Sequence, residues 1–168
     1  MKKLLICAVL ATALSALVLS AVQRPAVAQT PMGDFQYYVG SWSCMVAGPG
    51  EAPQKATAVY ALENGLMTET VNVPPQGNMK SAYHANAAIT YDAKAHRYVE
   101  TWLGNQADWS VSNMLAMEGN TEHWADTQNS TGKLGHTVVT RTSQNRFDFE
   151  GYPTLTSTKA ILKGTCTR

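Results

Sequence analysis

From residue 40 to the end of the chain, short runs rich in β-branched and aromatic residues alternate with turn-forming residues about every ten positions. This region contains no amphipathic helical pattern of about ten residues or more. Regular short strands separated by turns favour a β-sandwich or a β-barrel. The predicted strands are 42–47, 54–63, 66–73, 80–91, 97–103, 109–117, 121–126, 136–142, 146–151 and 157–167.

The turn at Asn64-Gly65 predicts the register of one hairpin. Asn-Gly between two β-rich runs favours a type I′ turn, because both central positions of that turn need positive φ. A two-residue loop then sets which residues face each other across the hairpin. The predicted pairs are Leu62 with Met67, Tyr60 with Glu69, and Ala58 with Val71.

A second hairpin is expected around the turn 92–96. If this turn pairs Tyr91 with Tyr98, the register places Ile89 opposite Glu100 and Ala87 opposite Trp102. Further turns at 118–120 and 143–145 also join strands that are adjacent in sequence. Local connections of this kind predict one antiparallel up-and-down barrel of about ten strands, because a long meander that curls until its edges meet removes open edges.

The first residues read as a secretory signal peptide. Lys2 and Lys3 precede an apolar run, and Ala26-Val27-Ala28 is a typical cleavage site. A transmembrane anchor is the alternative, since the run is near the shortest length that spans a bilayer. We predict a signal peptide over 1–28, a linker over 29–34 and one barrel domain over 35–168. The mature protein is then periplasmic or secreted, with Cys7 removed.

The net charge of the mature chain limits the kinds of partner that it can bind. Cleavage would leave 10 basic and 12 acidic residues, a formal net charge of about −2, and no basic patch. We therefore expect no nucleic-acid partner and no membrane anchor after cleavage. The oligomeric state stays open.

The two remaining cysteines predict how the barrel closes. In an exported chain, an isolated pair such as Cys44 and Cys166 favours a disulfide. Opposite residues of an antiparallel pair have a constant number sum, so this disulfide also places Trp42 opposite Arg168. Side chains two apart share a face, and we expect the guanidinium of Arg168 to lie beside the indole of Trp42 and close the barrel there.

These residues carry a family resemblance. Gly40-Ser41-Trp42, with a basic residue from the last strand, resembles the G-x-W and arginine feature of lipocalins and related calycin barrels. Residues 34–168 more closely resemble an uncharacterised bacterial family of exported lipocalin-like domains. The matching segments are 38–44, 61–65, 91–92 with 98–102, and 165–168. The resemblance implies a lipocalin-like barrel and brings no established activity.

No cofactor or metal is expected. The histidines have no metal-binding spacing; they are His84, His96, His123 and His136. The nitrobindins, a haem-binding class of related barrels, take their haem-ligating histidine from close to the C-terminus. The last histidine here lies about thirty residues before the end, so the resemblance does not predict haem. A G-x-S-x-G nucleophile motif and a phosphate-binding loop are absent from the sequence.

One strand face combines aromatic, acidic and small residues. If it faces inward, the candidate ligand-binding residues are Tyr60, Glu69, Tyr98, Glu100 and Trp102, with Tyr91 and the small residues Ala58, Ala85 and Ala87 beside them. Small residues opposite large ones leave room for a cavity, and a carboxylate there would bind a polar or cationic end of a mostly apolar ligand. The alternatives are that the aromatics fill the barrel and the glutamates face solvent, or that the opposite face lines the interior, with Thr57, Val59, Thr70, Thr90, Val99 and Thr101.

The sequence thus leads to three functional hypotheses. The first is a non-enzymatic protein that binds a small, largely apolar molecule inside the barrel. The second is a filled barrel that acts as a structural or interaction module of the cell envelope, motivated by the polar segment 126–135. The third is a small enzyme that uses Glu69 or Glu100 as a general base. The sequence identifies neither a ligand nor a physiological role.

Overall fold

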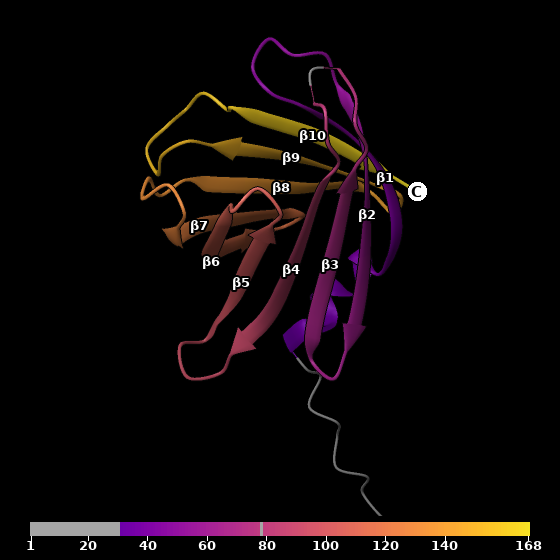
Figure 1. Ribbon diagram of the computed structural model, residues 1–168. Coiled ribbons are helices and arrows are strands. Elements are labelled where there is room, and N and C mark those ends of the chain that lie inside the picture. Colours follow the sequence, from indigo (N-terminus) through magenta and orange to yellow (C-terminus); the bar gives the residue numbers. More distant parts are fainter. Residues whose placement is uncertain (1–30, 78) are drawn as a thin grey trace, which may run out of the picture.

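The computed structural model describes residues 31–77 and 79–168, and these form a closed antiparallel barrel of ten strands (Figure 1). The predicted signal peptide and the first two residues of the predicted linker lie outside the described residues. The barrel order is β1-β10-β9-β8-β7-β6-β5-β4-β3-β2, so every strand pairs with its sequence neighbours and the ends meet. The strands are β1 (Gly40–Ala47), β2 (Gln54–Glu63), β3 (Leu66–Val73), β4 (Tyr83–Asp92), β5 (Arg97–Gly104), β6 (Trp109–Glu118), β7 (Thr121–Asn129), β8 (His136–Ser143), β9 (Arg146–Tyr152) and β10 (Leu162–Thr167).

The predicted up-and-down barrel is confirmed, and so are the two hairpin registers. Asn64 and Gly65 have φ of 51° and 80°, as a type I′ turn requires. Tyr60 lies opposite Glu69 in the β2–β3 pair, and Ala87 lies opposite Trp102 in the β4–β5 pair. Turn chemistry therefore decided the side-chain neighbours along four strands.

The ends of the chain close the barrel as predicted. Cys44 and Cys166 are direct partners in the β1–β10 pair, and their sulfur atoms are 2.01 Å apart. The guanidinium carbon of Arg168 lies 4.4 Å from the centroid of the Trp42 ring. Gly40 has a φ of 123°, and a β-carbon there would lie 3.6 Å from Nη1 of Arg168. A disulfide is consistent with an oxidising compartment.

We expect Arg168→Met to lower the free energy of unfolding by about 1 kcal/mol, because a cation–π contact is worth about that much. Urea denaturation followed by tryptophan fluorescence measures the change. Arg97→Met is the matched control, since Arg97 is exposed at the start of β5. An equal loss in both variants would contradict a specific role for the Arg168–Trp42 contact.

One end of the barrel is covered by the 3₁₀ helix η1 (Pro31–Tyr38). Its Met32 and Phe35 are fully buried, which they could not be in a free linker. The hydroxyl of Tyr37 donates to the carbonyl oxygens of Ser143 and Arg146 at 2.8 and 2.7 Å, which ties η1 to the β8–β9 turn. The linker predicted over 29–34 is therefore wrong from Pro31 onward, because apolar side chains there complete the core.

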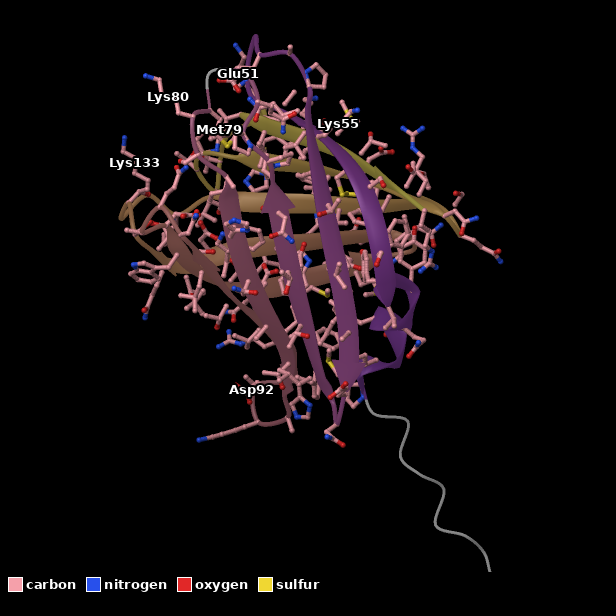
Figure 2. All side chains as sticks on the ribbon, turned by 45° about the vertical axis from the view of Figure 1, so that its right-hand side comes forward. Glu51, Lys55, Met79, Lys80, Asp92 and Lys133 are labelled. Carbon is pink, nitrogen blue, oxygen red and sulfur yellow. A yellow bond between two sulfur atoms is a disulfide. The ribbon has the colours of Figure 1, made fainter. Side chains whose placement is uncertain are left out.

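The opposite end carries the loops that connect β1 to β2, β3 to β4, β5 to β6, β7 to β8 and β9 to β10, and all of these except the β5–β6 loop are longer than the turns at the η1 end. Figure 2 shows Glu51, Lys80 and Lys133 in these loops at one end, and Asp92, the last residue of β4, at the other end. Ligands of small barrels enter at a mouth of this kind. In the described part of the chain, no helix is long and apolar enough to cross a membrane.

Three strand boundaries differ from the sequence prediction by three residues or more, and one of them is the start of β4, at Tyr83 rather than at residue 80. β10 starts at Leu162 rather than at residue 157, because residues 153–161 form the loop that precedes it. β7 continues to Asn129, so residues 126–129 are strand and the polar loop is confined to 130–135. β7 is longer than expected because it continues past an extra residue, Thr127, so that Asn129 still pairs with Ser110 of β6. Bulges of this kind leave no clear sequence signal.

Candidate functional site

One rung of the barrel brings four predicted residues into a row across four strands. Tyr60 pairs with Glu69, Glu69 with Ala87, and Ala87 with Trp102. Ala87 is only 5% exposed, whereas Val59 on the other face of β2 is 44% exposed. The aromatic and acidic face therefore points inward, and both the solvent-facing placement of the glutamates and the opposite-face alternative are wrong.

The two predicted glutamates sit on adjacent rungs. Glu69 accepts a hydrogen bond of 2.7 Å from the Tyr60 hydroxyl. Glu100 lies opposite Ile89 on one side and Ser112 on the other. Burial raises the pKa of Glu69 to about 7, and the Tyr60 hydrogen bond opposes that rise. Burial also raises the pKa of Glu100 to about 8, with further contributions from the charges on Glu69 and other interior carboxylates.

The predicted aromatics lie toward opposite ends of the interior. Tyr98 packs under η1, with its ring centroid 4.8 Å from that of Phe35 and its hydroxyl bonded to the Pro31 carbonyl. Trp102 points toward the loop end, where its Nε1 donates to Asp108 at 3.3 Å and to the Tyr83 hydroxyl at 3.2 Å. Tyr98 thus helps seal one end, while Trp102 is held in a fixed orientation near the mouth.

A buried ion pair that the sequence analysis missed lies beneath η1. Glu122 is 2% exposed and pairs with Arg141 of β8. It also accepts hydrogen bonds from the Tyr38 hydroxyl at 2.7 Å and from Nε1 of Trp124 at 3.1 Å. A signal was present: Glu122 and Trp124 are two apart, so a strand that buries Trp124 also buries Glu122.

Glu100 differs from the other interior carboxylates in its partners. Asp126 accepts hydrogen bonds from Ser112, Asn129 and the backbone of Gly135 at 2.8, 2.9 and 3.1 Å. Glu69 and Glu122 are also hydrogen-bonded, as described above. Within residues 31–77 and 79–168, no hydrogen bond or ion pair reaches the Glu100 carboxyl group. Glu100 is half-buried on the inward face of β5.

We expect stability to fall as the pH rises from about 5 to about 8. Both glutamates have a raised pKa in the folded state, so the folded chain holds protons that the unfolded chain has released. Their stabilising contribution is complete below the unfolded pKa of about 4.5 and is lost as the pH rises through the folded values of about 7 and 8. Urea denaturation across this pH range measures the trend.

The substitution Glu100→Gln isolates the effect, because it keeps the shape and removes the titration. It should raise the free energy of unfolding by more than about 1 kcal/mol at pH 8 and change it little at pH 5. Glu63→Gln is the control, since Glu63 is exposed at the end of β2. A Glu100→Gln variant with the same pH dependence as the natural protein would show that Glu100 does not titrate in this range.

Two open hollows are bordered by outward residues of the sheet and also by some inward ones, Trp124 and Asp126 in the first and Glu69 and Ala87 in the second. One of about 370 Å³ covers β6–β8 and is lined by residues that include Leu115, His123, His136 and Leu155. The other, of about 270 Å³, crosses β3–β5 and is lined mostly by outward residues such as Thr70 and Leu103. Within the described residues, no group of three or more His, Cys, Asp or Glu side chains is arranged to hold a metal ion.

Comparison with known proteins adds little to this geometry. No family model matches the chain, and a search of curated proteins finds no match. Among solved structures, the chain is similar to a redesigned β-barrel with 13% sequence identity and a TM-score of 0.41, over 79% of this chain and 92% of that chain. The class of protein is therefore defined by the structure itself, as a closed antiparallel β-barrel of ten strands.

Proposed function

We propose that this chain is an exported, non-enzymatic binding protein that holds a small, largely apolar molecule with a polar or cationic end inside the barrel. The proposal includes a signal peptide over 1–28 and a place in the exported lipocalin-like family that the G-x-W segment resembles. The barrel fold is compatible with either a binding or a structural role. The observation that carries the binding role is the inward Glu100 carboxyl group without a protein partner.

The loss of stability that the two inward glutamates cause at neutral pH supports a binding role. Two inward glutamates with raised pKa destabilise the folded chain at neutral pH, whereas apolar residues would not. Groups of this kind concentrate at functional sites, where stability is given up for activity. Small residues provide room beside them, because Ala58, Ala85 and Ala87 are all inward and buried.

The other hypotheses have less support. The structural module was motivated by the polar segment 126–135, and its first four residues belong to β7. An enzyme would need a group that stabilises developing charge beside Glu69 or Glu100. Among the described residues, Arg141 is the basic side chain that contributes to the buried core, and it is already paired with Glu122.

A matched pair of substitutions on β4 tests interior binding. Ala87→Phe places a ring inside the barrel, while Ala88→Phe places the same ring on the outer face, where Ala88 pairs with Thr68 and Thr101. The natural protein is purified from the periplasm and examined by native mass spectrometry for a bound molecule. It is then titrated with N-phenylnaphthylamine, an uncharged fluorescent apolar probe.

We expect Ala87→Phe to weaken probe binding by at least about tenfold, because an inward ring occupies the ligand's space. Ala88→Phe should bind within about twofold of the natural protein. Circular dichroism shows whether each variant is folded, and the smaller change Ala87→Leu replaces Ala87→Phe if the latter is not. Absence of both a copurified molecule and probe binding would overturn the proposal, and loss of binding in Ala88→Phe alone would move the site to the outer hollow.

A further inference from the structure

The barrel interior holds more acidic than basic side chains. The side chains of Glu69, Glu100, Glu122 and Asp126 point into the interior with their carboxyl groups. Among the described residues, one guanidinium group pairs with any of these four. That guanidinium belongs to Arg141, and it is committed to Glu122. Glu69 accepts a hydrogen bond from the neutral hydroxyl of Tyr60. Glu100 has no hydrogen bond or ion pair with the described residues. The pair Glu69 and Glu100 therefore lacks a balancing cation.

Aromatic residues lie on the same rung as Glu69 and on the rung beyond Glu100. Tyr60 lies beside Glu69 on the same rung, and Trp102 lies two strands further along that rung. Tyr91 and Tyr98 face inward on the rung beyond Glu100, with ring centroids 5.1 Å apart. Aromatic faces combined with carboxylates are the surroundings that organic ammonium groups prefer, because both attract positive charge and the rings also cover its apolar substituents.

We propose that the ligand is an organic cation and that its positive group takes the place of the proton held by the Glu69–Glu100 pair. This inference rests on the proposed function and adds the charge of the ligand and the exchange that accompanies binding. When the cation enters, a carboxyl O–H bond of the pair ionises, the proton leaves to solvent, and the carboxylate stays opposite the cation. No net charge is then added to the interior, which keeps the cost of burying the cation low.

The exchange makes binding depend on pH. The charged and titratable groups that face the pair are Tyr60 of β2, Tyr91 of β4, Tyr98 of β5, Glu122 and Asp126 of β7, Arg141 of β8 and Tyr38 of η1. Burial raises the pKa of the tyrosines Tyr38, Tyr60 and Tyr98, so they stay neutral. The pair is therefore the group that changes charge near pH 7. Below that pH, affinity for a cation should fall by up to about tenfold per pH unit for each proton displaced.

Three probes with one shared apolar group test the charge of the ligand: phenylpropyltrimethylammonium, phenylpropanol and phenylpropanoate. Isothermal titration calorimetry of the exported protein is run at pH 5, 7 and 8. At pH 7 the titration is repeated in phosphate and in Tris buffer, whose different protonation enthalpies reveal how many protons are released. The trimethylammonium group does not titrate, so any released proton comes from the protein.

We expect the cation to bind at least about tenfold more tightly than phenylpropanol at pH 8, and to release about one proton at pH 7. Glu100→Gln should abolish the preference for the cation and the proton release while phenylpropanol binds unchanged. Glu63→Gln should behave as the natural protein. Equal binding of the cation and phenylpropanol without proton release would overturn the proposal that a cation replaces the proton. The proposal that the barrel binds an apolar molecule would not be affected by that result. If none of the three probes binds and N-phenylnaphthylamine also fails, both proposals are overturned.

Discussion

Replacing both cysteines of the β1–β10 pair, the seam that closes the barrel, as Cys44→Ala/Cys166→Ala, should lower the free energy of unfolding by about 4 kcal/mol. The two cysteines are 122 residues apart in sequence, so the disulfide restricts almost the whole barrel domain in its unfolded state. In the chain-entropy model, longer closed loops give larger stabilisation. Equilibrium urea denaturation of the natural protein and the double variant, both at pH 7, measures the difference.

Reduction provides the internal control for this experiment. Dithiothreitol should lower the urea midpoint of the natural protein to that of the double variant, and it should leave the variant unchanged. The barrel itself should persist in the variant, because β1 and β10 still pair over five residues. A double variant within about 1 kcal/mol of the natural protein would show that backbone pairing, rather than the disulfide, holds the seam.

The second large effect is expected at the ion pair beneath η1. Arg141→Met should lower the free energy of unfolding by about 3–5 kcal/mol, because it leaves the Glu122 carboxylate buried without its cation. The side chains of Glu122 and Arg141 are 3% and 16% exposed, so water cannot replace the guanidinium. Urea denaturation at pH 7 measures this change.

A neighbouring exposed pair supplies the comparison. Arg146 and Asp148 form an ion pair of 3.0 Å on β9, with side chains that are 51% and 32% exposed. Arg146→Met should cost less than about 1 kcal/mol, since surface pairs contribute little. The double variant Arg141→Met/Glu122→Leu should recover part of the loss, because it removes the unpaired charge as well. Similar costs for Arg141→Met and Arg146→Met would mean that burial does not strengthen the first pair.

These two effects concern different parts of the molecule. The disulfide closes the sheet, and the ion pair ties β7 and β8 to η1 through the Tyr38 hydroxyl. Together they hold the barrel against the destabilising pair of Glu69 and Glu100 that lies between them.

Signals from a few residues, one local and one between the two ends of the chain, accounted for much of the fold. Asn64-Gly65 predicted the β2–β3 register, and the position of the two cysteines predicted the β1–β10 register. Both depend on few residues, because a tight turn or a disulfide leaves one alignment of the strands. The start of η1 at Pro31 and its burial were not predicted, because Met32 and Phe35 become buried only through contacts with strands far along the chain.

The candidate site was predicted only in part, for a related reason. The sequence placed Glu69 beside Tyr60 and Glu100 beside Ile89, since both pairs follow from hairpin registers. Glu122 pairs with Arg141 across β7 and β8, which are joined by a longer loop with no register signal.

The sequence by itself determined the strands, the local turns, the seam and the sharing of one strand face by aromatic and acidic side chains. Only the tertiary structure decided that this face points inward. Both faces of β2 to β5 mix polar and apolar residues, so alternation alone does not distinguish them. Closure of the barrel settles the choice, because Trp42 and Phe147 pack into the core together and the register then carries their face through β2 to β5. The isolation of Glu100 is likewise a property of the closed barrel, since Ser112, the residue opposite it on β6, donates its hydrogen bond to Asp126.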